Sequence, residues 1–336
     1  MQFQISCPNC SSINNSLQTN YNTKNNGIRR LLKCTDCQRC YSETWNTFMF
    51  NIKYSISKIA MVIKARTEGM GFNATCRIHA ISAHTLQSWE IKFSQLKDTL
   101  MAYTLSHAFI SLTIEGDELY TKVGKDVPQH ESKGWTIMLM DRASRFVLDL
   151  TCGEKNEALF INAMQRLSEI IEITGDLSLV TDGETRYSKF LFEICHDLVR
   201  SGKPGRPQKV LPEGLRIKMK NKGSQAHKLG PKKKKCVSPK AEHPNTSKTL
   251  NNSDIHANHV ESQNAAMRRK NSAYSRKTNT YAKTQIALQR TLDLYWVVHN
   301  FVREHFTTRE VPAFSIGVIN NPMSLHQIMM SVSMVF

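Results

Sequence analysis

Residues 109–124 read FISLTIEGDELYTKVG, and residues 177–183 read LSLVTDG. In the first stretch, apolar and polar residues alternate, which is the pattern of a strand with one buried face. The second is a short apolar run that stops at an Asp-Gly pair, which is typical of a buried strand followed by a turn. Each predicted strand therefore leads to an aspartate, Asp117 within the first and Asp182 directly after the second.

The segments between these strands predict a mixed α/β sheet. Residues 135–141 and 145–152 have the apolar pattern of a β-hairpin, and the spacing of apolar residues over 155–173 is typical of a helix. A further helix is expected over about 185–199. The resulting order β-β-β-α-β-α is the start of a ribonuclease-H-like mixed sheet, so the predicted fold class is α/β.

Two CxxC pairs lie near the start of the chain. Cys7 and Cys10 form CPNC, and Cys34 and Cys37 form CTDC. Each pair sits on a tight turn, and four converging thiolates complete a closed tetrahedral zinc site. Four thiolates leave no open coordination position, so we expect this zinc to be structural. Cys40 is a further thiol nearby that could compete as a ligand.

A helix-turn-helix-like segment follows the cysteines. An amphipathic helix is expected over 55–66, and residues 71–89 (GFNATCRIHAISAHTLQSW) have the layout of two short helices around a tight turn. Ser82 is expected to cap the second of these, which runs to about Leu96. In helix-turn-helix proteins the second helix lies in the major groove of DNA. A packing module without a DNA role is the alternative. The expected DNA contacts on the second helix are His84, Gln87 and Ser88, with Lys92 reaching a phosphate.

Charge is distributed unevenly along the chain of 336 residues. The formal net charge is +17, which indicates a polyanionic partner. Residues 100–199 nevertheless carry 9 Lys and Arg against 16 Asp and Glu, whereas residues 200–240 carry 14 against 1. Bound divalent cations are one reason for such an acidic block. The polar start of the chain and the paired cysteines favour a reducing cytosol, and no apolar run reaches transmembrane length.

Three acids could hold those cations. Asp117 and Asp182 would emerge close together if their strands are adjacent. Glu261 opens a basic helix within the helical region expected from His259 to about Phe306, and Asn264 and Arg268 on the same face are expected to position phosphate. Two divalent cations held by carboxylates from several elements activate the attacking oxygen and stabilise the leaving oxygen in phosphoryl transfer.

Each of these acids also has an ordinary structural interpretation. Three neighbouring acids compete with Asp117, and the Asp182-Gly183 pair could be a simple turn. Glu261 could be an acid that interacts with the helix dipole. The competing acids are Glu115, Glu118 and Asp126.

With these motifs in view, the chain resembles the insertion-sequence-one family of transposases, in the form in which the DNA-binding and catalytic parts are one polypeptide. The resemblance spans nearly the whole chain, and its most specific part is IHANHVESQNAAMRRKNSAYSRKTNTYAK at 255–283, followed by LDLYWVVHNFVREHFTTREVPA at 292–313. The other matching stretches are CPNC…CTDC, residues 71–89, GDELYTKVGK, VTDGETRY and LRIKMKNKGSQ.

The resemblance implies a DDE recombinase with Asp117, Asp182 and Glu261 as its metal-binding triad. Such an enzyme binds the terminal inverted repeats of its element through the zinc ribbon and helix-turn-helix. It uses two Mg²⁺ ions, which Mn²⁺ can replace, for strand cleavage and strand transfer into target DNA. We expect a homodimer or higher oligomer on double-stranded DNA, in a bacterial cytoplasm and associated with the nucleoid. The expected backbone contacts are Arg268, Arg269, Arg276 and Lys277.

The expected domains follow the same order. They are a zinc ribbon (1–50), a helix-turn-helix (51–100), a ribonuclease-H-like catalytic domain (101–315) with a basic insertion at about 200–258, and a C-terminal tail (316–336). Two rival functions remain: a DNA-binding regulator derived from an inactive transposase, and a related nuclease that cuts but does not join. Metal-dependent cleavage and strand-transfer assays separate the three.

Overall fold

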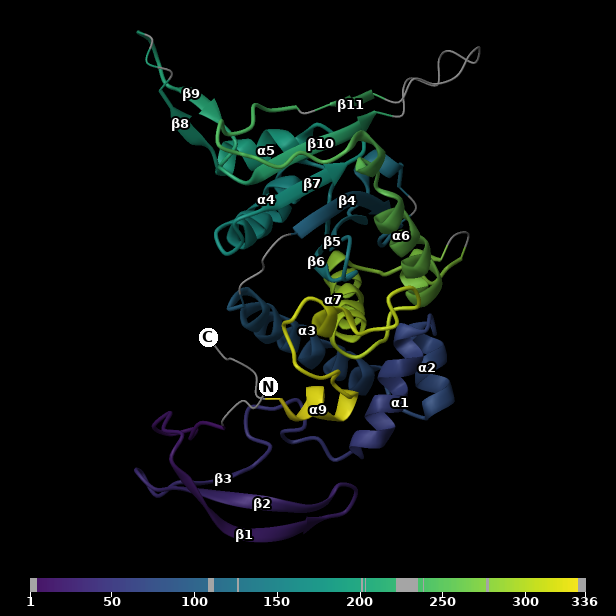
Figure 1. Cartoon of the computed structure of the whole chain (residues 1–336). Coiled ribbons are helices and arrows are strands. Elements are labelled where there is room, and N and C mark those ends of the chain that lie inside the picture. The colour runs from purple at the N-terminus through teal and green to yellow at the C-terminus, as the bar shows by residue number, and fades with distance from the viewer. Residues whose placement is uncertain are drawn as a thin grey trace.

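The computed structural model describes residues 5–107, 112–125, 127–200, 202, 204–221, 235–237, 239–275 and 278–331. Figure 1 shows three levels from bottom to top: a small N-terminal sheet, a group of helices, and a larger sheet with helices on it. No helix within these ranges combines the length and the apolar character that crossing a membrane requires.

The N-terminal ribbon is a three-stranded antiparallel sheet. It consists of β1 (Asn15–Thr23), β2 (Gly27–Cys34) and β3 (Cys40–Ser42), in the order β1-β2-β3. Its small core is separate from that of the rest of the molecule and contains Cys7, Leu32, Cys34 and Tyr41. With so few apolar residues, burial of apolar surface contributes little to the stability of the ribbon.

Three helices follow: α1 (Ile56–Thr67), α2 (Phe72–His79) and α3 (Ala83–Leu105). The Ser82 hydroxyl accepts a hydrogen bond from the Thr85 backbone N–H (3.1 Å), which caps α3 as its sequence predicts. The expected length of α3 was wrong, because the helix continues past residue 96 to Leu105. The boundary expected at residue 100 therefore falls inside a continuous helix.

The large sheet has six strands in the order β11-β10-β7-β4-β5-β6. Strands β4 and β10 each pair with β7 in parallel, whereas β4, β5 and β6 form an antiparallel meander. This mixed α/β sheet is compatible with a ribonuclease-H-like fold. The strands are β4 (Leu112–Tyr120), β5 (Trp135–Asp141), β6 (Val147–Gly153), β7 (Leu177–Thr181), β10 (Leu215–Asn221) and β11 (Lys235–Val237).

The remaining regular elements are helices and a small ribbon. The helices are α4 (Glu157–Ile171), α5 (Arg186–Ile194), α6 (Asn258–Lys270), α7 (Gln285–Phe301), α8 (Pro312–Ser315) and α9 (Leu325–Met330). The ribbon pairs β8 (Asp197–Val199) with β9 (Gln208–Val210). Short 3₁₀ turns occupy Gln129–Glu131, Asn252–Asp254 and Ser272–Tyr274.

Side chains on β4 show which helices cover which face of the sheet. Asp117 contacts Asn264 of α6, while a Cβ added to the adjacent Gly116 would lie 3.6 Å from Tyr187 of α5. Successive residues of a strand point to opposite faces, so α6 covers one face and α5 covers the other. Helix α7 runs along β6, where Trp296 Nε1 donates to the Val147 carbonyl (2.7 Å).

Three sequence-based expectations need correction. The helix expected to reach 199 ends at Ile194, and residues 197–199 form a strand instead. The long helical region expected from 259 is two helices, α6 and α7, joined by irregular chain. Finally, the segment expected to be a tail contains α9, which packs on α1 and buries Ile328 and Met329 in the main core.

Candidate metal and nucleic-acid site

The four paired cysteines converge at one end of the ribbon. Their sulfur atoms all lie within 4.8 Å of one another, with Cys7 Sγ 3.4 Å from Cys37 Sγ and Cys10 Sγ 3.6 Å from Cys34 Sγ. Sulfurs around a tetrahedral zinc with Zn–S bonds of about 2.3 Å are separated by about 3.8 Å. The group can therefore bind zinc, and exposed Cys40 is not part of it.

Two equivalent turns bring these cysteines together. In the first turn Ser11 N–H donates to the Cys7 carbonyl (3.0 Å), and in the second Gln38 N–H donates to the Cys34 carbonyl (3.1 Å). Ser11 and Gln38 both have a positive φ, so the chain turns sharply just after each pair. The Arg39 backbone N–H lowers the pKa of Cys37 to about 6, which favours the thiolate form that binds a metal.

The two aspartates occupy neighbouring strands of the large sheet. In the parallel pair β4–β7, Gly116 is opposite Thr181, so Asp117 and Asp182 are the next residues along each strand. Both side chains are half-buried. Burial raises the pKa of Asp117 to about 6, and the negative charge of Asp182 acts in the same direction. A divalent cation between the two carboxylates would relieve this repulsion.

Asn264 joins Asp117 from the neighbouring helix. Its Nδ2 donates to Asp117 Oδ2 (2.7 Å), and its side chain is 2% exposed. Its Oδ1 is buried and accepts no hydrogen bond from any residue that the structure describes. A buried amide oxygen without a donor is a suitable ligand for Mg²⁺ or for a water molecule bound to it. The donor set here thus fits a hard divalent cation.

Glu261 lies in the first turn of α6, three residues before Asn264, and its side chain is exposed. Residues three apart lie on the same face of a helix, so Glu261 is on the face that carries Asn264. A first-turn acid also interacts favourably with the helix dipole, so the structural interpretation of this residue is satisfied as well. The sequence assigned phosphate positioning to Asn264, whereas the structure places its amide on Asp117.

The neighbouring acids that compete with Asp117 are engaged elsewhere. Glu118 Oε2 pairs with Lys155 Nζ (3.1 Å), and burial raises the pKa of Glu118. Glu115 is fully buried, and its Oε1 accepts from Arg142 Nε (2.7 Å) and His259 Nδ1 (2.8 Å). The third competitor, Asp126, lies outside the described residues.

Only some of the α3 residues expected to contact DNA are exposed on the surface. His84 and Gln87 are exposed on the first turns of the helix, and Ser88 is half-buried. Lys92 does not extend outward as expected: its Nζ donates to the backbone carbonyls of Phe48 (3.1 Å) and Phe50 (2.8 Å). Lys92 therefore joins α3 to the turn region that lies between β3 and α1.

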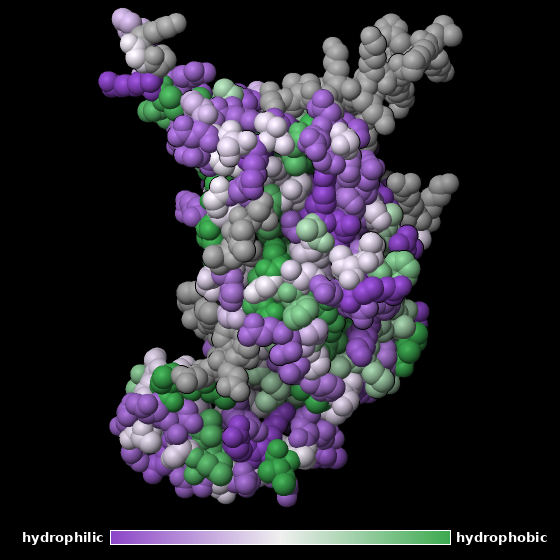
Figure 2. Space-filling model, in the orientation of Figure 1, coloured by the Kyte–Doolittle hydropathy of each residue, from purple (hydrophilic) through white to green (hydrophobic). Residues whose placement is uncertain are grey.

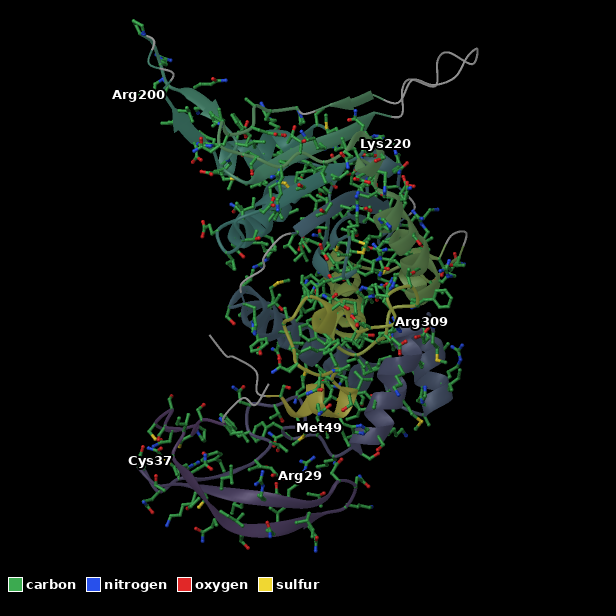
Figure 3. The ribbon with its side chains drawn as sticks, in the orientation of Figure 1. Arg29, Cys37, Met49, Arg200, Lys220 and Arg309 are labelled. Carbon is green, nitrogen blue, oxygen red and sulfur yellow. The ribbon has the colours of Figure 1, made fainter. Side chains whose placement is uncertain are left out.

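The basic end of α6 carries Arg268, Arg269 and Lys270 in its last turn. Arg269 is exposed and Arg268 is half-buried, while Arg276 and Lys277 lie outside the described residues. In Figure 2, strongly hydrophilic side chains gather on the upper right of the molecule, over α6 and the neighbouring strands. Figure 3 places Lys220 on this upper part, whereas Arg29 and Cys37 lie on the ribbon.

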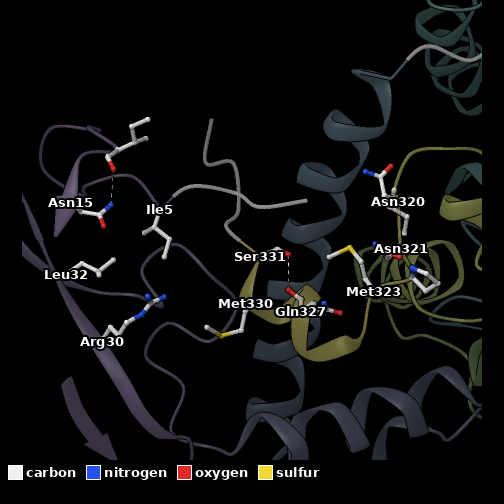
Figure 4. Close-up of a pocket in the computed structure, with 13 residues that line it drawn as sticks. Ile5, Asn15, Arg30, Leu32, Asn320, Asn321, Met323, Gln327, Met330 and Ser331 are labelled. Atoms are coloured by element: carbon white, nitrogen blue, oxygen red, sulfur yellow. Dashed lines mark hydrogen bonds between the residues drawn. The ribbon is translucent and has the colours of Figure 1, made fainter. Parts of the chain in front are cut away.

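A cleft of about 760 Å³ lies elsewhere, between the ribbon and the C-terminal segment (Figure 4). Ile5, Asn15 and Leu32 line one side, and Met323 and Met330 line the other. None of its lining residues belongs to β4, β7 or α6. The cleft is thus a gap between two modules and is separate from the acids.

Several residues around the acids were not assigned a role from the sequence. Arg142, Lys155 and His259 all bind carboxylates of β4, and Glu115 was considered only as a competitor of Asp117. The strand pattern contained one signal, because Glu115 and Asp117 are two residues apart and so share a face. The basic side chains that bind these acids come from distant segments, and no sequence pattern indicated that they would lie near β4.

Comparisons with known proteins add little to this geometry. No protein-family model matches the chain, and no curated protein matches its sequence. Among solved structures, the chain is similar to one described as the crystal structure of the Mos1 strand transfer complex. The identity is 9%, the TM-score is 0.16, and the match covers 40% of this chain and about half (52%) of that one. The site is therefore interpreted from its own residues.

Proposed function

We propose that this protein is a DNA transposase that cleaves and joins DNA strands with divalent metal ions. The main support is the meeting of Asp117 and Asp182 on adjacent parallel strands, with Asn264 of a basic helix bound to Asp117. The unpartnered Asn264 oxygen and the raised pKa of Asp117 both favour a cation at this position. Glu261, on the same helix face as Asn264, is the proposed third carboxylate.

In this proposal, Mg²⁺ bound by the acids supplies the activation of the attacking oxygen. Asp117 and Asp182 hold the ions, and Asn264 fixes the orientation of the Asp117 carboxylate. Arg268 and Arg269, at the opposite end of α6 from Glu261, bind the phosphate backbone of the strand that enters the site. No side chain acts as the nucleophile, because water and then a DNA 3′-hydroxyl attack the phosphorus.

The N-terminal modules would provide recognition of the terminal inverted repeats. The zinc-bound ribbon and the exposed start of α3 are the proposed contacts, with His84, Gln87 and Ser88 facing the bases. Because the chain is strongly basic, binding should weaken steeply as salt increases. Joining two element ends requires two protein copies, so the proposed active form is a dimer or larger assembly on DNA.

The test is a cleavage and joining assay with purified protein, Mg²⁺ and a labelled duplex that carries the element's own terminal repeat. The Asp182→Asn variant should lose both nicking and joining while it still binds the duplex. Asp197→Asn is the control, since Asp197 lies in the separate β8–β9 ribbon and not in the large sheet that holds the two aspartates. Activity should persist in the control if the folded sheet is retained.

Other outcomes distinguish the rival functions. Specific binding without cleavage in the wild-type protein would favour an inactive, transposase-derived regulator. Cleavage without joining of pre-cut ends would favour a nuclease. Equal activity of Asp182→Asn and the wild type would show that Asp182 is not part of the catalytic site.

A further inference from the structure

The N-terminus of α6 has no cap from its own sequence. Its N-cap residue, Ala257, has no side chain that can accept a hydrogen bond, and the first N–H groups of any helix lack partners within the helix. Glu115 of β4 fills this role from outside the helix. Its Oε2 accepts from the backbone N–H groups of His259 (3.0 Å) and Val260 (2.9 Å).

The second oxygen of Glu115 is equally occupied. Oε1 accepts from Arg142 Nε (2.7 Å) and from His259 Nδ1 (2.8 Å), so the carboxylate receives four hydrogen bonds. Burial by itself raises the pKa of Glu115, but these hydrogen bonds outweigh it and hold the pKa below its ordinary value. The group is therefore ionised, and His259 donates through Nδ1–H.

A metal ion could in principle bind here, because Glu115, His256 and His259 offer ligand atoms within 4.8 Å of one another. The hydrogen-bond donors that surround Glu115 argue against a metal ion at this position. A carboxylate has about four lone-pair positions, and all four of Glu115 already face N–H groups. The Arg142 guanidinium, which also donates to the His256 carbonyl (2.7 Å), would repel a cation at this point.

The spacing links this cap to the proposed metal site. Glu115 and Asp117 are two residues apart on β4, a step of about 6.7 Å along a strand. Val260 and Asn264 are four residues apart on α6, a step of about 6 Å along a helix. Because the two steps match, a helix anchored by Val260 at Glu115 brings Asn264 to Asp117, where the 2.7 Å hydrogen bond is found.

We infer that Glu115 is a positioning residue: its carboxylate caps α6 from the neighbouring strand and holds Asn264 and Glu261 in register with Asp117. This inference rests on the proposed function, since it assigns Glu115 a role in building that metal site. Glu115 itself touches neither metal nor DNA. Its effect is transmitted through the position of one helix.

The test compares Glu115→Gln with Glu90→Gln. A glutamine at 115 presents only one oxygen, so either the two α6 amides or the Arg142 and His259 donors lose their acceptor. Glu90 is the matched control because its carboxylate is also buried and also accepts from an arginine Nε at 2.7 Å, that of Arg66. That pair joins α1 to α3 and not β4 to α6.

Three measurements are made on both full-length variants: Mn²⁺ binding by electron paramagnetic resonance, amide exchange of the first turn of α6, and Mg²⁺-dependent cleavage. We expect Glu115→Gln to exchange faster at His259 and Val260 and to bind Mn²⁺ roughly 10- to 100-fold more weakly, as is usual when a supporting contact of a metal site is lost. Cleavage should recover in part at high Mn²⁺, while binding to the terminal-repeat duplex stays unchanged.

Two results would overturn the inference. If Glu115→Gln and Glu90→Gln show the same Mn²⁺ affinity and cleavage, Glu115 serves stability alone. If Glu115→Gln does not fold, Glu115→Asp is used, because it keeps the charge but shortens the side chain; faster amide exchange at Val260 with the Mn²⁺ affinity of the wild type would then overturn the inference. A wild-type protein that binds no Mn²⁺ and cleaves no DNA would instead refute the proposed function, and the exchange data would still report whether the cap exists.

Discussion

At the scale of single residues, the site depends on how donors are shared among buried carboxylates. Asp117 receives a side-chain hydrogen bond from Asn264 and keeps a raised pKa, because burial outweighs its hydrogen bonds, whereas Glu115 receives four hydrogen bonds and keeps a lowered pKa. Two acids on the same face of one strand thus differ in chemistry. The acid with few donors can accept a metal ion, and the acid with four donors can only support the structure.

Replacing Asn264 with alanine tests this division. The variant should lose the hydrogen bond to Asp117 and the buried amide oxygen, and we expect its Mn²⁺ affinity to fall roughly 10-fold or more. Titration of Mn²⁺ by electron paramagnetic resonance measures the change. Ser262→Ala is the control, because Ser262 is exposed on the same helix. An unchanged Mn²⁺ affinity in Asn264→Ala would exclude this residue from the metal site.

At the scale of elements, the ribbon is the part of the fold with the smaller hydrophobic core. Its core cluster holds four residues, two of which are the cysteines Cys7 and Cys34. The two hairpin strands expose most of their side chains, so apolar burial contributes little to their stability. Metal binding and folding of the ribbon should therefore be coupled.

Cys34→Ser should release zinc and unfold the ribbon while the remainder of the protein stays folded. Cys34 is fully buried within the sulfur group, and its loss leaves three thiolates. Cys40→Ser is the matched control and should retain zinc, since Cys40 is exposed and lies outside the group. Zinc content after gel filtration and circular dichroism provide the readouts. Zinc retained in Cys34→Ser and lost in Cys40→Ser would reverse the ligand assignment.

At the scale of the whole molecule, the helices α1 to α3 and the large sheet form one body. Apolar residues of α1 and α3 belong to the same core cluster as β4 to β7 and α7. The turn after α1 also presses against α6, because a Cβ on Gly69 would lie 2.4 Å from the Arg269 carbonyl oxygen, and Gly69 has a φ of +91°. The exposed start of α3 and the two aspartates are therefore held in a fixed relation.

Two histidines, His299 in the buried interior and half-buried His305, link stability to pH through their titration. Burial lowers the pKa of His299 to about 3 and that of His305 to about 4. Because these folded-state values are below the unfolded value of 6.5, the unfolded chain binds protons first as pH falls. The contribution of each histidine is complete above about pH 6.5 and is lost as the pH approaches its folded pKa.

The His299→Gln variant should lack one group that takes up a proton when the chain unfolds at mildly acidic pH. Between about pH 6 and pH 4, the free energy of unfolding of the wild type should fall by about 1.4 kcal/mol more per pH unit than that of the variant. Urea unfolding at several pH values measures both slopes. Glutamine can still donate to the Arg145 carbonyl, which His299 Nε2 contacts at 2.9 Å. Parallel slopes for the two proteins would show that His299 does not control the pH dependence.

The sequence by itself determined the features that depend on local pattern. The paired cysteines, the Ser82 cap and the strand before Asp182 all depend on residues close together in the chain, and the structure has each of them. The lengths of helices were less well predicted. Helix α3 continues beyond residue 96 because its later turns are buried against α7, where Lys97 pairs with Asp293, 196 residues further along the chain. The helix expected to reach 199 ends early for a similar reason, since residues 197–199 pair with β9.

Only the tertiary structure decided how the candidate site is built. The sequence offered Asp117, Asp182 and Glu261 as a set, and adjacent strands do bring the two aspartates together. Nothing in the local pattern indicates that Asn264 binds Asp117 or that Glu115 caps a helix that begins more than 140 residues later. Hydrogen bonds of this kind depend on the docking of α6 against β4, and that docking is set by the packing of the whole core.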